Sequence, residues 1–418
     1  MKESDAISAP APSCRLCGQL LEHVAVDLGM SPLCESYVPA EALDRMEPFY
    51  PLRVYVCARC FLMQLPQHVP PEQIFEEYAY FSSYSDSWVA HARRYAEEMH
   101  ARLPLDGTRR VVEIGSNDGY LLRHFASLGV PVLGIEPAAN VAADAQAHGI
   151  STLVRFFNSG LALELVAEGV RADLLVVNNV LAQVPELNDF MAGLAVLLAP
   201  DGLLTLEFPH VLRLLEENQF DTIYHEHFSY FSLGTARRGL ERHGLTVVDV
   251  EELTTHGGSL RLHVRHAAAG SAIAGRVDRL LARERQGGLE TLDRFVQFGA
   301  QVEATKRELL QALIRLRSAG HSIVGYGAPG KANTLLNYCG IRGDMVSYTV
   351  DRNPYKQGRY TPGTHIPIMH PDHIRQTRPD YVWILPWNLR DEVAEQLSYV
   401  RDWNGRLMVA IPHFEVLP

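Results

Sequence analysis

Short apolar runs alternate with amphipathic segments along the middle of the chain. Between Arg109 and Phe208 the runs are typical of buried strands, and the segments between them have the apolar spacing of helices. In chain order, the expected elements are a strand at 110–115, a helix at 120–128, a strand at 130–136, a helix at 138–148, a strand at 173–178, a helix at 187–198 and a strand at 202–208. This alternation predicts a parallel sheet covered by helices.

A long helical segment leads to a second unit of the same kind. Between 271 and 317 apolar residues recur three and four apart, with a break at Gly287-Gly288. A strand, a glycine-rich turn and a helix follow between 321 and 338, and later strands are expected at 345–350, 381–385 and 406–410. The fold class is therefore α/β with two Rossmann-like units, and the expected domains are 1–70, 71–265 and 266–418.

Composition places the chain among globular enzymes and narrows its partners. Of 418 residues, 47% are hydrophobic and 21% are charged. The net charge of −11 argues against nucleic acid as a partner, because phosphate binding needs clustered Lys and Arg. No apolar run is as long as a membrane span, and the first residues lack a basic-then-apolar signal. We therefore expect a cytoplasmic protein with no membrane partner, in a compartment where thiols stay reduced.

Four of the six cysteines form two Cys-x-x-Cys pairs, Cys14 with Cys17 and Cys57 with Cys60. Each pair suits one edge of a tetrahedral Zn²⁺, and two pairs close the site without an open position. The sequence therefore predicts a structural zinc site within residues 1–70. Two unrelated turns or a disulfide are the alternatives.

A polar, glycine-containing turn follows the first strand of the central unit. It runs from Glu113 to Gly119, and Glu136 ends the next strand about twenty residues later, where it can bind ribose hydroxyls. The glycines are four apart, so the turn is not a GxGxxG motif. Its acidic residues would repel a pyrophosphate but suit a cationic cofactor that carries an amino acid, such as S-adenosylmethionine (SAM). An ordinary turn at a sheet edge is the alternative.

Two histidines, a glutamate and two tyrosines crowd into residues 224–230, read as YHEHFSY. They follow the predicted strand at 202–208, and substrates of open α/β sheets bind beyond the carboxyl ends of strands. Such a cluster supplies a general base, a group that sets its tautomer, and a proton donor. A polar loop with packed histidines is the alternative.

The second α/β unit also begins with a glycine-rich turn, GYGAPGK at 325–331. It joins a strand to a helix, so it exposes backbone N–H groups to an anion, and Lys331 adds a charge suited to a diphosphate. The spacing is not that of a Walker sequence. Asp351 and Asn353 follow the next strand and suit ribose or base contacts, and Trp387-Asn388 suits stacking. An ordinary turn with solvated polar residues is the alternative.

These motifs together resemble one family. The motifs that carry the resemblance are the ExGSNDG turn, the acid of IEP at Glu136, NNVLA at 178–182, YHEHFSYFS, the cysteine pairs and the C-terminal GYGAPGKANTLLNY, DRNPYKQGRYTPGTHIPI and PWN segments. They are similar to motifs of SAM-dependent C-methyltransferases that act on nucleotide-linked deoxy-ketosugars in antibiotic pathways. The resemblance spans nearly the whole chain. It implies a zinc domain, a central SAM-binding domain, and a C-terminal domain that helps to hold the nucleotide-sugar.

The resemblance also implies a reaction, methyl transfer to a carbon next to the ketone of a dTDP-linked ketosugar through an enolate. His227 is then the base, Glu226 and Tyr224 orient it or bind sugar hydroxyls, and Tyr78 or Tyr80 contributes a phenol. The expected cofactor-binding residues are Glu113, Gly115, Asn117, Asp118, Gly119, Tyr120, Glu136, Pro137, Asn178, Asn179 and Ala182. The expected substrate-binding residues are Gln183, His225, His256, Gly327, Lys331, Asn333, Thr334, Asp351, Asn353, Lys356, His365, Trp387 and Asn388.

One departure from the family leaves a second activity open. Many relatives carry His where this chain has Gln183, which can hydrogen-bond an enolate but cannot titrate. A ketoreductase using NADPH, alone or together with methyl transfer, is therefore the alternative function. The missing GxGxxG and the acid at Glu136, which would repel a 2′-phosphate, argue against a pure reductase. A non-catalytic zinc scaffold would leave the YHEH cluster without a role. We expect a monomer or a homodimer.

Overall fold

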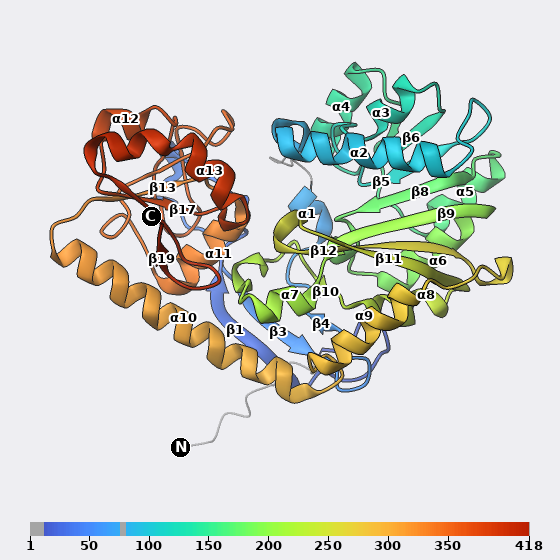
Figure 1. The fold of residues 1–418 in the computed structure, drawn as a ribbon, viewed down its shortest axis with the longest axis horizontal. Coiled ribbons are helices and arrows are strands. Elements are labelled where there is room, and N and C mark those ends of the chain that lie inside the picture. The colour runs from blue at the N-terminus through green and yellow to red at the C-terminus, as the bar shows by residue number, and fades with distance from the viewer. Residues whose placement is uncertain (1–11, 76–80, 418) are drawn as a thin grey trace.

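The computed structural model describes residues 12–75 and 81–417, which form three sheets and a short ribbon. The central sheet and the C-terminal sheet lie on opposite sides of the molecule, and a long helix runs along the edge between them (Figure 1). Within the described residues, no helix is long and apolar enough to cross a membrane.

The N-terminal domain is a small antiparallel sheet with the order β1-β3-β4-β10. Its strands are β1 (His23–Ser31), β3 (Tyr50–Val56), β4 (Met63–Gln64) and β10 (Ser229–Tyr230). The fourth strand is therefore supplied by the YHEHFSY segment of the central domain. A further short strand, β2 (Val38–Pro39), pairs with β15 (Arg359–Tyr360) of the C-terminal domain.

The central domain contains a seven-stranded sheet with the order β11-β12-β9-β8-β5-β6-β7. Its strands are β5 (Val111–Ile114), β6 (Val132–Ile135), β7 (Thr152–Leu153), β8 (Ala172–Asn178), β9 (Leu198–Pro209), β11 (Leu245–Leu253) and β12 (Ser259–His266). The strands predicted between 110 and 208 are β5, β6, β8 and β9, and they are parallel as expected. The sheet continues with β12, which was not predicted and is antiparallel to both of its neighbours, β9 and β11.

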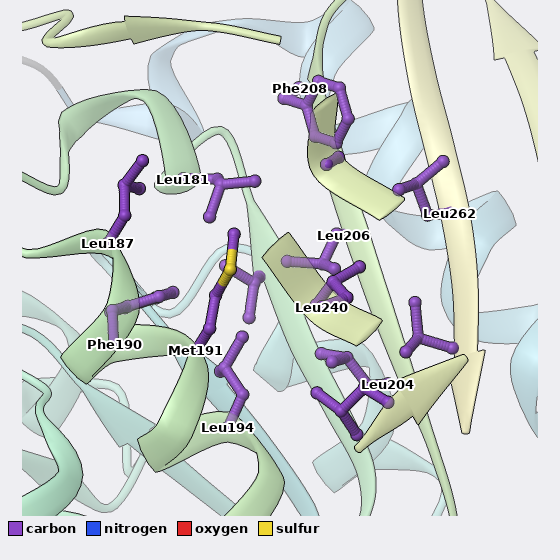
Figure 2. Packing of buried hydrophobic residues seen from close by; sticks show 14 of the residues in the cluster. Leu181, Leu187, Phe190, Met191, Leu194, Leu204, Leu206, Phe208, Leu240 and Leu262 are labelled. Atoms are coloured by element: carbon purple, nitrogen blue, oxygen red, sulfur yellow. The ribbon is translucent and has the colours of Figure 1, made fainter. Parts of the chain in front are cut away.

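Alternate residues of each central strand pack against different helices, as the two faces of a strand require. Leu174 and Val176 join a core with helices α2 (Asp86–Arg102), α3 (Leu122–Ser127) and α4 (Ala139–Ala147). Leu175 and Val177 face the other way, into a core with α5 (Ser159–Ala167), α6 (Leu187–Leu197) and α8 (Leu233–Glu241). Figure 2 shows this second layer, where Met191 and Phe190 of α6 lie near Leu204 and Leu206 of β9. Burial of each such side chain contributes about 1.5–3 kcal/mol.

The C-terminal domain is joined to the rest by helices α9 (Gly275–Gln286) and α10 (Leu292–Ser318), which are separated at the predicted Gly287-Gly288 break. Its sheet has the order β16-β14-β13-β17-β18-β19. The strands are β13 (Ile323–Tyr326), β14 (Thr349–Val350), β16 (Ile368–Met369), β17 (Tyr381–Ile384), β18 (Arg406–Val409) and β19 (Glu415–Val416), and the helices are α11 (Gly330–Cys339), α12 (His373–Thr377) and α13 (Arg390–Gln396).

The N-terminal and C-terminal domains share one hydrophobic core. Val54 of β3, Phe298 of α10 and Trp383 of β17 belong to the same buried cluster, which α10 joins along its length. In Figure 1 this helix runs beneath β1 and β3 toward the C-terminal sheet. A buried apolar contact of this kind restricts the motion of the two domains relative to each other.

Several short elements were not predicted from the pattern. Helix α5 begins at an Asn158 cap, whose side chain accepts a hydrogen bond from the Leu161 amide, a signal present in the sequence but overlooked. The strand expected at 345–350 is reduced to Thr349–Val350. Helix α7 (Val211–Glu216) and the one-turn helix α1 (Pro71–Phe75) are short, and short elements have weak periodicity.

Candidate active site

The four paired cysteines come together as predicted. The Sγ atoms of Cys14, Cys17, Cys57 and Cys60 all lie within 4.8 Å of one another. The Cys14–Cys60 and Cys17–Cys57 Sγ atoms are 3.5 Å apart, close to the roughly 3.8 Å expected of sulfurs around a tetrahedral Zn²⁺. Each of the six cysteines is a free thiol, so the disulfide alternative is wrong. The donor set and its geometry fit a closed structural zinc site.

The cysteine cluster is connected to the YHEH segment through Arg15 and Gln64. The Gln64 amide donates a hydrogen bond to Cys14 Sγ at 3.2 Å and accepts one from the Arg15 backbone at 3.0 Å. The Arg15 guanidinium then donates to the carbonyls of Leu65, at 2.8 Å, and Phe228, at 2.5 Å. Burial lowers the pKa of Arg15 to about 10, so it remains charged at neutral pH. Phe228 directly follows His227.

His227 is held by two contacts from its own loop. Its Nδ1 lies 3.2 Å from the Thr222 carbonyl, so Nδ1 carries the hydrogen and Nε2 is left as the proton acceptor. The Tyr224 ring lies against the imidazole, with centroids 4.2 Å apart. Burial is the main reason that the pKa of His227 falls to about 4, and the nearby His256 and Lys331 lower it further. The imidazole is therefore neutral at pH 7, as a base requires.

The neighbours of His227 point elsewhere, because His225 and Glu226 lie in a turn that is closed by the His227 amide, which donates to the Tyr224 carbonyl at 2.9 Å. The Glu226 carboxylate accepts from the buried Cys34 thiol at 3.4 Å. The carbonyl of Thr222, predicted for no role, holds the tautomer that Glu226 was expected to set. His225 lies against Tyr50 and His68 of the N-terminal domain, with its Nε2 3.2 Å from the Pro51 carbonyl.

The predicted cofactor-binding residues meet at the carboxyl ends of three neighbouring strands. The end of β5 and the turn after it contain Glu113, Gly115, Asn117, Asp118, Gly119 and Tyr120. The loop after β6 contains Glu136 and Pro137, and the end of β8 and the loop after it contain Asn178, Asn179 and Ala182. The Glu136 carboxylate accepts from the amides of Asn117 and Ala138, each at 2.9 Å, and so joins two of these loops.

The segment before α2 covers this turn. The amide of Ser82 donates to Asn117 Oδ1 and the amide of Ser83 donates to Asp118 Oδ2, both at 2.9 Å. Tyr78 and Tyr80, expected to contribute a phenol, lie outside the described residues.

Buried polar atoms in the cleft suit a cationic, amino-acid-bearing ligand. Within the described residues, both carboxylate oxygens of Glu113 and the side-chain oxygens of Ser116, Asn178 and Asn179 are buried without a hydrogen-bond partner. Burial, and then the charges of Asp118 and Glu136, raise the pKa of Glu113 well above its usual range. Burial raises the pKa of Glu136 to about 7. A positive ligand would satisfy these acceptors, and the set therefore fits SAM.

The C-terminal domain contacts the loop that carries His227. Lys331, at the start of α11, donates to Asn388 Oδ1 at 2.7 Å and lies 4.8 Å from the Trp387 ring centre. Trp387 Nε1 in turn donates to the buried Asp221 at 2.7 Å, six residues before His227. Burial raises the pKa of Asp221 to about 6 and lowers that of Lys331. Three predicted substrate residues thus border the His227 loop.

Other predicted substrate residues make contacts between domains. Asn333 donates to the Cys34 carbonyl at 2.6 Å, and Thr334 donates to the Ile223 carbonyl at 3.0 Å. Lys356 is buried 3.4 Å from Glu35, and His365 bonds to Glu47. The remaining positions belong to the loops around them: Gly327 precedes α11 with a φ of +87°, Asp351 accepts from the Ala328 and Asn353 amides, and Gln183 is half-buried in the turn after β8.

Several residues around the cleft were missed. Glu207 of β9 is fully buried and contacts His91 and Arg261, beside Trp88 and His256. A glutamate inside the apolar run GLLTLEF was a visible signal, since a charge in a buried strand needs partners. Those partners lie on α2 and β12, far away in the sequence.

Three family models match the chain in order. Residues 14–75 match a model described as "Putative zinc binding domain", residues 88–250 one described as "Methyltransferase domain", and residues 254–412 one described as "C-methyltransferase C-terminal domain". With the acidic cofactor turn, these matches define the class of the protein as a SAM-dependent methyltransferase.

Comparison with individual proteins identifies the family. The chain is 34% identical over 411 residues to C-methyltransferase NovU of Streptomyces niveus, covering 98% of both chains. It is 27% identical over 113 residues to the ubiquinone biosynthesis O-methyltransferase of Azorhizobium caulinodans, which covers 27% of this chain and 44% of that enzyme. A solved magnesium protoporphyrin IX methyltransferase from Synechocystis is 19% identical, with a TM-score of 0.35, over 42% of this chain and 83% of the other. The chain belongs to the C-methyltransferase family with an N-terminal zinc binding domain.

Metal content tests the cysteine cluster. We expect about one zinc per chain in purified protein, because the four thiolates close a tetrahedral site. Replacement Cys57→Ser should lower this content, whereas Cys339→Ser, a buried cysteine outside the cluster, should leave it unchanged. Elemental analysis is the measurement, and a metal-free wild-type protein that folds normally would contradict the assignment.

Arg15 should contribute to stability far more than an exposed arginine of the same domain. We expect Arg15→Ala to lower the free energy of unfolding by about 2–3 kcal/mol, because buried carbonyls lose a charged donor. Arg53→Ala, which removes a half-exposed ion pair with Asp27, should cost less than about 1 kcal/mol. Urea unfolding measures both, and equal losses would disprove the special role of Arg15.

Proposed function

We propose that the protein transfers the methyl group of SAM to a carbon next to the ketone of a dTDP-linked keto-deoxyhexose. The observation that carries this proposal is the state and position of His227. It is neutral, its hydrogen is committed to the Thr222 carbonyl, and its loop is bonded to Ala182 after β8 through Phe228 and to Trp387 of the C-terminal domain through Asp221. SAM supplies an electrophilic methyl group when bound.

The chemistry of a carbon acid accounts for such a base. A proton next to a ketone leaves only if a base is placed on it while the enolate oxygen is stabilised. A positioned base typically contributes about 10²–10⁴-fold in rate. Hydrogen bonds to a buried group are stronger than the same bonds in solvent.

A nucleotide-linked substrate is supported by the far wall of the cleft. Lys331 stands at the N-terminus of α11, a ten-residue helix whose free amides favour an anion. Lys331 and Trp387 together suit a diphosphate next to a base or sugar ring. Hydride transfer from NADPH has no comparable support: the matching models are of methyltransferases, and Glu136 stands where a 2′-phosphate would need a positive side chain.

Loss of His227 tests the base directly. We expect His227→Ala to lower methyl transfer by about 10²–10⁴-fold while the Kd for SAM changes by less than about threefold, since His227 acts on the sugar carbon. The measurements are product mass spectrometry on a panel of dTDP-ketosugars and titration calorimetry with SAM. The control, His225→Gln, alters a histidine that faces the N-terminal domain and should keep most activity. Near-normal transfer by His227→Ala would remove this residue from the mechanism.

Lys331 tests the nucleotide side of the cleft. We expect Lys331→Met to weaken dTDP binding about tenfold or more, because one desolvated charge contact to a diphosphate is lost. The matched control is Lys306→Met: Lys306 also bonds a carbonyl, of Tyr338, and also lies over an aromatic ring, but it belongs to α10. Calorimetry with dTDP should detect the difference, and equal affinities for the two variants would place the nucleotide elsewhere.

A further inference from the structure

A buried charged network lies at the carboxyl end of β9, apart from the proposed base. Glu207 is fully buried, and its carboxylate accepts from Arg261 of β12 at 2.8 Å and lies 3.2 Å from His91 of α2. The Thr255 hydroxyl donates to the other oxygen of Glu207 at 3.0 Å. Burial alone would raise the pKa of Glu207. His91 and Arg261 lower this pKa by more than burial raises it, so the carboxylate stays ionised.

Stability alone does not account for this network. Two charges removed from water cost free energy that their attraction often fails to recover, and apolar residues would fill the same space at no such cost. What the network adds is a fixed position for Thr255, which begins the short turn Thr255–Gly257 between β11 and β12.

That turn presents His256. Its backbone has a φ of +53°, in the left-handed region that non-glycine residues rarely adopt. Besides the Thr255 bond, the turn is held by Gln219, whose amide donates to the Gly257 carbonyl at 2.7 Å. The His256 ring lies against Trp88, with centroids 5.0 Å apart. A strained residue held from several sides is typical of a functional position.

The turn that carries His256 also contacts the segment that leads to His227, through the bond from Gln219 to Gly257. The Nε2 of His256 lies 3.5 Å from the Asn179 amide at the end of β8, beside the cofactor turn. The next residue, Gly257, leaves room for Trp387, since a Cβ there would come within 2.5 Å of the indole, and Trp387 bonds Asp221 of the His227 loop. In the described part of the chain, no protein group bonds to Nδ1 of His256. This nitrogen is therefore available to a ligand.

We propose that His256 donates a hydrogen bond to the ketone oxygen of the substrate as it becomes an enolate, and that Glu207 and Thr255 are positioning residues for His256. This inference rests on the proposed function. With Nε2 facing the Asn179 amide, Nδ1 carries the hydrogen that is donated. A neutral imidazole can act as the hydrogen-bond donor that polarises a carbonyl group.

The reaction then balances as follows. His227 Nε2 takes the proton from the carbon, and the C–H electron pair forms a C=C bond while the C=O electrons move onto oxygen, where His256 stabilises them. The C=C pair next attacks the methyl carbon, a C–C bond forms, the C=O bond returns, and the S–CH₃ pair leaves with sulfur as the thioether of S-adenosylhomocysteine. The proton on His227 is released to solvent.

Exchange of the substrate proton in D₂O isolates enolate formation from methyl transfer. Wild-type enzyme with a dTDP-ketosugar and S-adenosylhomocysteine should exchange this proton, and His227→Ala should not. Asparagine is the replacement for His256, because it also adopts a positive φ. We expect His256→Asn to slow proton exchange and to lower kcat by about 10²-fold or more. The Kd and the KM for SAM should change by less than about threefold.

Matched threonine variants test the positioning. Thr255→Val should lower exchange and kcat about tenfold, and Thr255→Ser should restore both, because the hydroxyl is what Glu207 holds. The control, Thr205→Val, removes a buried hydroxyl that lies on the same strand as Glu207 and bonds Tyr95 of α2, and it should leave the rate within about twofold.

The outcomes separate two failures. The role of His256 and its network would be overturned if His256→Asn exchanged the substrate proton as fast as the wild-type enzyme. Equal effects of Thr255→Val and Thr205→Val would overturn it as well. Either result would leave the proposed function intact. Absence of exchange in the wild-type enzyme with every dTDP-ketosugar would overturn the proposed function and this inference together.

Discussion

The arrangement of the cleft depends on one strand pairing, in which β10 of the central domain completes the sheet of the N-terminal domain. Ser229 and Tyr230 pair with Gln64 and Met63, and the half-buried Arg15, directly after Cys14, bonds to the carbonyls of Phe228 and Leu65. His227 lies two residues before this strand. The domain of the cysteine cluster, whose members lie between 167 and 213 residues earlier in the sequence, therefore helps to fix the position of His227. The zinc binding domain is thus part of the architecture of the active site rather than an attached module.

The same loop is fixed from its other side by the C-terminal domain. Thr334 bonds the Ile223 carbonyl and Trp387 bonds Asp221, so α11 and the loop after β17 hold the residues just before His227. The shared core along α10 keeps that domain in place. A loop of polar residues between three domains would ordinarily be mobile, and it is ordered here because each domain satisfies part of its backbone.

Burial gives the two walls of the cleft different electrostatic character. At the ends of β5 and β6, desolvation raises the pKa of Glu113 and Glu136, and a cation bound beside them would lower it again. On the opposite side, desolvation lowers the pKa of His227, His256 and Lys331. The acids thus favour a sulfonium cofactor, and the two histidines stay neutral and able to accept or donate a proton at pH 7.

The sequence by itself determined the features that depend on neighbouring residues. The Cys-x-x-Cys spacing predicted the cysteine cluster, and the strand-turn-helix pattern placed Glu113, Asn117 and Glu136 at one sheet edge, because parallel strands carry their ends to the same side. Only the tertiary structure decided where the side chains of His225, Glu226 and His227 lie. The first two form a turn, and the register of β10 against β4, together with contacts from the N-terminal and C-terminal domains, sets the position of that turn. The partners of Glu207, and the use of Asn333 and Thr334 between domains, were likewise hidden, because such contacts join residues that are distant in sequence and leave no local periodic signal.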